Sequence, residues 1–226
     1  MEKLLAGSNL IITLMLAHLI ASLAVVEIRH LKSAILVLVA QSALLAAIFA
    51  SFAYLTGTPA LYLWALTCVL TKVIFIPVLL WRYSNHLPPQ EVRPMVGFQV
   101  SVVLLSIAVV AFYRFIHAHV DFIAPTPAAT IEPVRSSLAI AFTIIALGLY
   151  TATIRRDAIK IVIGIILMEN GVHLTLVALA PTLPETTILG VSTNVVILAW
   201  LMLYVTGGVY RMLGTTDTTE LSHLRR

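Results

Sequence analysis

Four ionisable residues interrupt long apolar stretches of the sequence: His18, Lys72, Glu169 and His173. A charged side chain at the centre of a bilayer costs roughly 2.5–3.5 kcal/mol on insertion scales, so it normally faces the protein interior and has a function. A carboxylate, an imidazole and an amine can each gain and lose a proton, and a low-dielectric environment disfavours the charged form of each. The chemistry that these residues predict is proton or ion translocation.

The spacing and the charges of these residues predict that they meet. Glu169 and His173 are four residues apart, so a helix places them on one face. Lys72 has the opposite charge and a comparable depth in its own apolar stretch, so pairing with Glu169 would offset much of the cost of burial. We expect the two charges to face the interior, in direct contact or bridged by His173 and water. Two interpretations stay open, a proton path and a purely structural pair.

Uncharged polar residues at similar depths are expected to support this set. Amide and hydroxyl groups commonly form hydrogen bonds between membrane helices. We expect these groups to point into the bundle, toward one another, or toward a partner subunit. The supporting candidates are Gln41, Ser42, Asn170 and Asn194.

The elements that must position these residues are transmembrane helices. The chain has 226 residues, of which 60% are hydrophobic and 11% charged, whereas a soluble domain carries about 25% charged residues. A spanning helix needs roughly 20 mostly apolar residues, and runs that are continuously apolar exclude a β-barrel. The predicted fold class is therefore an all-α polytopic membrane bundle with seven transmembrane helices. The expected spans are 9–27, 34–55, 60–81, 95–116, 136–154, 161–180 and 187–212.

Basic residues gather in the loops on one side of the predicted bundle. Ten fall on that side: Arg29, Lys32, Arg82, Arg93, Arg155, Arg156, Lys160, Arg211, Arg225 and Arg226. The other side has three: Lys3, Arg114 and Arg135. Because cytoplasmic loops carry the excess of lysine and arginine, the N-terminus is expected outside and the C-terminus in the cytoplasm.

The first three predicted helices resemble the last three. Ile28-Arg29 aligns with Ile154-Arg155, Gln41-Ser42 with Glu169-Asn170, and Thr71-Lys72-Val73 with Thr193-Asn194-Val195. The fourth helix returns the chain to the outside, so both triplets start on the same side. The sequence therefore predicts a parallel 3+1+3 repeat, with a first repeat at 1–94, a linking helix and outer loop at 95–134, and a second repeat at 135–226.

The sequence contains no pattern typical of a soluble catalytic site. It has no phosphate-binding loop or dinucleotide-binding glycine motif, and Cys68 is its single cysteine. His117 and His119 are two potential metal ligands, but we expect them to lie in a solvated loop. We expect no bound metal, cofactor or catalytic residue. The basic residues lie at helix ends rather than in a patch, which argues against a nucleic-acid partner.

Three motifs resemble the hydrogenase-4 membrane component E family over nearly the whole chain. They are Met168-Glu169-Asn170-Gly171-Val172-His173-Leu174, Thr71-Lys72-Val73 with Pro77, and Ala40-Gln41-Ser42. The resemblance implies a non-catalytic membrane subunit of a group 4 nickel–iron hydrogenase, a class of complex related to respiratory complex I. It implies antiporter-like membrane subunits, a membrane anchor and a soluble nickel–iron arm as partners. The implied location is the inner membrane of a prokaryote.

The last three helices also resemble the small K subunit of complex I and the C subunit of multi-subunit antiporters, through Arg155-Arg156 and Ile163-Gly164. In the K subunit two membrane glutamates take part in proton translocation. Anchoring on Ile163-Gly164 places the first at Ile166, three residues before Glu169, and the second at Asn194, which cannot titrate. The resemblance therefore implies that Lys72, at the repeat-equivalent position, replaces the second glutamate.

The leading hypothesis is a subunit that contributes to ion translocation coupled to electron transfer in its partners. Two other classes remain open. One is transport, by a subunit of a cation/proton antiporter or by a free-standing carrier. The other is a structural scaffold that joins antiporter-like subunits to the core of a complex.

Overall fold

The computed structural model describes residues 7–85, 98–155 and 157–214. The secondary-structure elements formed by these residues are helices. Among the described residues, seven helical segments are long and apolar enough to cross a membrane, which confirms the predicted all-α bundle. The long helices are α2 (Ser8–Glu27), α3 (Leu31–Thr56), α6 (Phe98–Ala118), α8 (Val134–Ile154), α9 (Ala158–Leu179) and α10 (Glu185–Leu213). The third span combines α4 (Ala60–Cys68), a π-helical segment η1 (Val69–Phe75) and α5 (Ile76–Ser84).

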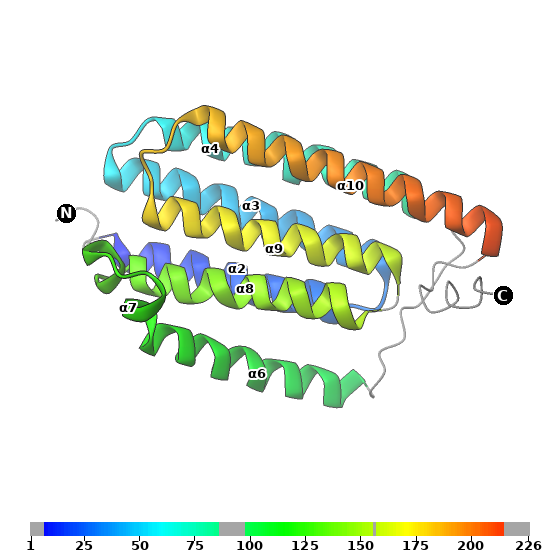
Figure 1. Cartoon of the computed structure of the whole chain (residues 1–226), viewed down its shortest axis with the longest axis horizontal. Coiled ribbons are helices and arrows are strands. Elements are labelled where there is room, and N and C mark those ends of the chain that lie inside the picture. The colour runs from blue at the N-terminus through cyan, green and yellow to red at the C-terminus, as the bar shows by residue number, and fades with distance from the viewer. Residues whose placement is uncertain (1–6, 86–97, 156, 215–226) are drawn as a thin grey trace.

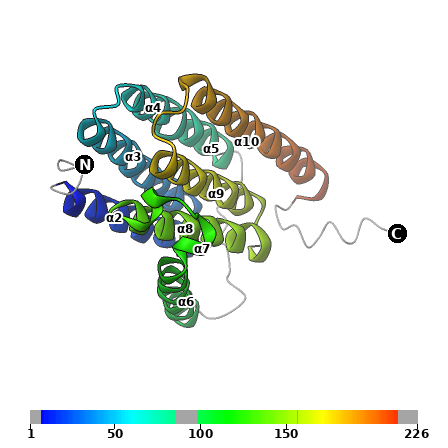
Figure 2. The same ribbon diagram turned by 60° about the vertical axis from the view of Figure 1, so that its left-hand side comes forward.

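The helices form two layers, which Figures 1 and 2 show from two directions. One layer holds α2, α3 and the α4–α5 span, and the other holds α8, α9 and α10. Between the layers α2 contacts α8, α3 contacts α9, and α10 contacts α4 and α5, while α6 packs at one edge against α8 and α2. Helices of equal rank in the two predicted triplets are thus neighbours. The predicted repeat and its domain boundaries remain predictions.

The connection between α6 and α8 contains two short helical turns. These are α7 (Val120–Ile123) and the 3₁₀ turn η2 (Pro127–Thr130). They cover a small second apolar cluster that includes Ile116, Val120 and Leu138. This connection fixes one end of α6 to the start of α8.

The third span changes its winding at the segment that carries Lys72. The backbone N–H of Ile76 bonds to the carbonyl of Thr71, five residues earlier, as in a π-helix. Pro77 follows directly and has no N–H to donate, so an ordinary α-helical bond is missing at this point. Such π-turns are rare and occur frequently at functional sites. Lys72 therefore projects from a locally irregular part of its helix.

Helices α8 and α9 approach each other closely through glycines. A Cβ atom on Gly164 would lie 2.8 Å from the backbone of both Ala152 and Gly148, and one on Gly171 would lie 2.7 Å from the carbonyl of Ala141. No larger residue fits at these positions without separating the helices. Small residues at membrane helix contacts allow such close backbone packing. The contact holds α9, and with it Glu169, against α8.

Candidate functional site

The Lys72 amine is the centre of a buried polar cluster between η1 and α9. Its side chain is 1% exposed and forms an ion pair with Glu169. The same Nζ donates to Asn170 Oδ1 at 2.6 Å and lies 2.7 Å from His173 Nδ1. An ammonium has three N–H groups, and here it has three partners. The predicted contact between Lys72 and Glu169 is therefore present.

His173 lies between the two charges. Its Nδ1 is 3.0 Å from Glu169 Oε1 as well as 2.7 Å from Lys72 Nζ. A neutral Nδ1 accepts a hydrogen bond from the amine, whereas a protonated Nδ1 donates to the carboxylate. The other nitrogen, Nε2, is buried and has no hydrogen-bond partner among the described residues. When Nδ1 gains or loses its proton, His173 can therefore change its hydrogen-bond partner between the Lys72 amine and the Glu169 carboxylate.

A chain of amide hydrogen bonds continues the cluster toward α2. Asn170 Nδ2 donates to Gln41 Oε1 at 2.7 Å. Gln41 Nε2 lies 3.1 Å from Ser22 Oγ and 3.1 Å from His18 Nε2. His18 Nδ1 lies 2.8 Å from the Gln41 carbonyl oxygen, which can only accept, so Nδ1 carries the proton and Nε2 accepts from the amide. Every bond then has a donor and an acceptor.

These contacts join four helical elements into one network. His18 comes from α2, Gln41 from α3, Lys72 from η1, and Glu169, Asn170 and His173 from α9. His18, Gln41 and Asn170 are fully buried, and Glu169 is 10% exposed. Burial at this level requires polar groups to be paired. The structure thus brings together all four predicted ionisable residues and two of the supporting amides.

Ser42 and Asn194 lie outside this network. Ser42 is buried, its hydroxyl has no partner among the described residues, and its carbonyl accepts from Cys68 Sγ at 3.7 Å. Asn194 is exposed on α10. The reason is the rotation of α10 about its axis. One side of this helix packs against the bundle, and Asn194 lies on a different side. The packed side consists of Ser192, Val195, Ala199, Leu203 and Thr206.

A second buried ionic cluster lies at the end of α2, and sequence reasoning missed it. Arg155 Nη2 donates to Glu27 Oε1 at 2.7 Å, and both side chains are 6% exposed. Ser101 Oγ donates to the same oxygen at 3.2 Å. Lys160, 1% exposed, donates to the Val25 carbonyl at 2.7 Å and so binds the negative end of α2.

Of the basic residues predicted between the fifth and sixth spans, Arg155 directly follows α8 and Lys160 lies in the first turn of α9. Both are buried against the end of α2 and are not solvated loop charges. The signal in the sequence was Glu27, a carboxylate at the end of an apolar stretch on the side rich in basic residues. Asp157, between them, accepts from the N–H groups of Ile159 and Lys160 and caps α9.

The two histidines near the connection between α6 and α8 have local structural contacts. His117 Nε2 lies 3.0 Å from Glu132 Oε1, and His119 Nδ1 lies 2.8 Å from the Phe115 carbonyl. Burial raises the pKa of Glu132, but hydrogen bonds from Ser136 and His117 outweigh it and hold the pKa below the usual value. Within residues 7–85, 98–155 and 157–214, no group of three or more His, Cys, Asp or Glu residues could hold a metal ion.

Comparison with known proteins adds a second line of evidence. The family described as NADH-ubiquinone/plastoquinone oxidoreductase chain 4L matches residues 136–226. The chain is similar to "Hydrogenase-4 component E" of Escherichia coli strain K12 and of Shigella flexneri, at 26% identity over 98% of this chain and 100% of each relative. It is 24% identical to an uncharacterized protein of Mycobacterium tuberculosis over 91% of both chains. No solved structure matches it significantly.

Proposed function

Because the chain belongs to the hydrogenase-4 component E family, with a C-terminal part of the chain 4L type, we propose that it is a non-catalytic subunit through which a membrane oxidoreductase translocates ions. The chain is a multi-pass membrane subunit of the hydrogenase-4 and complex I-like kind. Electron transfer would occur in partner subunits, and the driven ion movement would involve the network around Lys72.

The single observation that carries this proposal is the contact of Lys72, Glu169 and His173 within hydrogen-bond reach. An amine, a carboxylate and an imidazole in contact can hold one proton in several arrangements that differ by short transfers. Removing the proton from Lys72 or adding one to Glu169 cancels their attraction, which is strong in a low-dielectric interior. Each transfer would therefore change the forces between η1 and α9.

The amide chain gives this cluster a connection across the bundle. Asn170 and Gln41 do not titrate, but they orient His18 on one side and Lys72 on the other. Water molecules would have to complete a route between the titrating groups, as ordered water does in polar interiors. In this proposal His18 is the second titratable station, on α2.

In this arrangement a carboxylate and an amine would take the place of the two membrane glutamates expected from the resemblance to the K subunit. Asn194 cannot titrate, and its exposed position on α10 leaves it outside the cluster. Lys72, from the first triplet, lies in contact with Glu169 from the second. The proposed path therefore crosses between the two triplets.

A structural scaffold is the second candidate, and one observation favours it. The ion pair and the amide chain are almost completely satisfied by protein groups, as a permanent link between helices would be. Membership in a multi-subunit antiporter is the third.

Co-purification tests the assignment to an oxidoreductase complex. A tagged full-length chain, extracted in mild detergent, is expected to bring with it antiporter-like membrane subunits, a membrane anchor and a soluble subunit that contains nickel and iron. Mass spectrometry and metal analysis of the purified assembly would identify them. Isolation with antiporter subunits alone, or as a lone oligomer that transports ions, would contradict the proposal.

We further propose that the N-terminus is outside and the C-terminus is in the cytoplasm of a bacterial inner membrane. Cysteines introduced at Leu87 and Thr219, which lie outside the described residues, are expected to be protected from an impermeant thiol reagent added to intact cells. A cysteine at the exposed Thr126 is expected to react. The buried Cys68 provides the background. External labelling at position 219 would reverse the orientation.

A further inference from the structure

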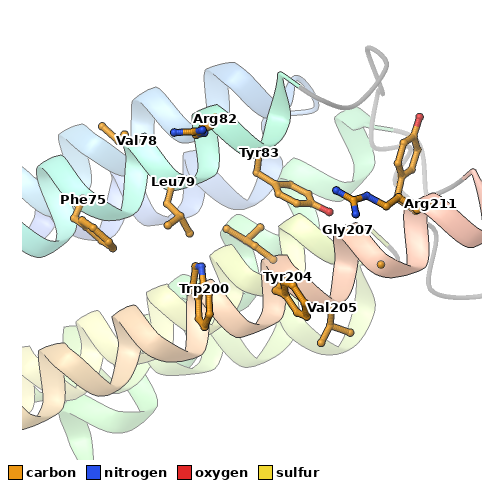
Figure 3. A pocket seen from close by; sticks show the side chains of 13 residues that line it. Phe75, Val78, Leu79, Arg82, Tyr83, Trp200, Tyr204, Val205, Gly207 and Arg211 are labelled. Carbon is orange, nitrogen blue, oxygen red and sulfur yellow. The ribbon is translucent and has the colours of Figure 1, made fainter.

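A cleft of about 830 Å³ opens between the third span and α10. Figure 3 shows it from close by, with α5 above and α10 below. Its walls come from η1, α5 and the second half of α10. The lining includes Phe75, Leu79, Arg82, Trp200, Leu203 and Arg211.

The walls of this cleft are apolar and incompletely covered. Phe75 is 49% exposed, Trp200 54% and Tyr204 73%. The lining of the third span runs from Phe75 to Tyr83, which corresponds to about 12 Å along a helix. This is the depth of an acyl-chain segment below the membrane surface rather than a full span of about 30 Å.

Two arginines line the cleft. Arg82 lies near the end of α5 and Arg211 near the end of α10, so both lie where these spans leave the apolar layer. Two guanidinium groups from different helices suit a phosphate, which arginine binds through paired hydrogen bonds. Tyrosine and tryptophan at this level are typical of the membrane interface.

Tyr83 supplies an additional polar group at this end. Its hydroxyl is buried and has no hydrogen-bond partner among the described residues. A Cβ atom on Gly207 would lie 2.8 Å from that hydroxyl, so the glycine makes room for the ring. Figure 3 shows the hydroxyl on the side of the cleft where Arg211 lies.

We propose that this cleft binds an anionic phospholipid. The phosphate contacts Arg82 and Arg211, and an acyl chain lies between the third span and α10 along Phe75, Leu79 and Leu203. Basic pockets between membrane helices bind anionic head groups in this way. A transmembrane helix of another subunit is the competing occupant, but the cleft covers only the half of α10 from Trp200 to Arg211. The proposal does not depend on the proposed function or on the orientation of the chain.

Photo-crosslinking of lipids tests this site. The full-length chain, in the assembly that mild detergent extracts, is placed in nanodiscs with phosphatidylglycerol or phosphatidylcholine that carries the same photoreactive acyl chain. The phosphatidylglycerol probe is expected to label peptides of α5 and α10 several-fold more than the phosphatidylcholine probe. The Arg82→Gln/Arg211→Gln variant should lower labelling to the level of the neutral lipid. Arg114→Gln, an exposed arginine on α6, should leave it unchanged.

A pair of glycine variants tests the acyl part of the site. Gly208 lines the cleft and Gly190 lies near the start of the same helix, and a Cβ atom at either position meets nothing within 4 Å. Gly208→Leu fills the cleft and should reduce labelling at least severalfold, whereas Gly190→Leu should not. Equal labelling by both lipids, no effect of the arginine variant, or a crosslink from Trp200 or Tyr204 to another subunit in place of lipid would overturn the proposal.

Discussion

Lys72→Met is expected to destabilise the protein by about 3–5 kcal/mol, the usual cost of breaking a buried ion pair by removing one partner. Methionine matches the length of the lysine stem but leaves the Glu169 carboxylate, 10% exposed, with His173 as its remaining ionic contact. It also removes the donor to Asn170. Thermal unfolding in detergent and the yield of assembled complex would measure the loss.

The double variant Lys72→Met/Glu169→Gln shows whether the loss comes from the unpaired charge. Neutralising both members removes that charge, so most of the stability should return. Lys32→Met is the matched control, because Lys32 is exposed and its amine lies 5.6 Å from the centre of the Trp81 ring. Its effect should be at most about 1 kcal/mol. A double variant no more stable than Lys72→Met would show that the pair is not the source of the stability.

Glu169→Gln is expected to reduce coupled ion translocation by at least about tenfold, since a positioned proton-transfer group typically contributes roughly 10²–10⁴-fold. Glutamine keeps the shape and an oxygen that accepts from Lys72, but it cannot take up a proton. The complex should therefore still assemble, although its thermal stability should fall, because the Lys72 ammonium loses its carboxylate partner. The measurement is the pH gradient that inverted membrane vesicles form when electron transfer is started, normalised to the amount of complex.

The control for this prediction is Glu132→Gln, which neutralises a carboxylate in the connection between α6 and α8. The side chain of Glu132 is 41% exposed. Its translocation rate should match the unmodified chain. Assembly must be checked in the same membranes, so that a lost subunit is not mistaken for a lost path. Normal translocation by Lys72→Met/Glu169→Gln would discard the ion path and leave the scaffold.

The transmembrane helices could be predicted because the bilayer sets their length. The expected spans 34–55 and 161–180 correspond to α3 at Leu31–Thr56 and α9 at Ala158–Leu179. The contact between Lys72 and Glu169 was predictable for a related reason. Unpaired charges in an apolar layer are costly, so two opposite charges at equal depth are expected to meet.

The side of a helix that faces its neighbours was harder to predict. Apolar residues surround each span on all sides, so the hydrophobic pattern does not distinguish the interior from the lipid face. Asn194 illustrates this, because its polarity predicted a supporting role, while the packing of α10 leaves it exposed. Lys160 is the opposite case, a helix-end lysine that the fold buries completely. The depth of a residue in the membrane follows from the apolar composition of its span. The rotation of the helix about its axis depends on tertiary contacts.

The glycine contact between α8 and α9 determines which of the two charges can be displaced. Gly148, Gly164 and Gly171 lock the helix of Glu169 against its neighbour at backbone distance, and densely packed backbones resist sliding. Lys72 instead lies in a π-turn, where one backbone hydrogen bond joins residues five apart and not four. The carboxylate is therefore attached to the closely packed helix, and the amine is attached to the helix that can move. A cycle that separates these charges is therefore expected to show its largest backbone displacement in the third span, with α9 as the fixed reference.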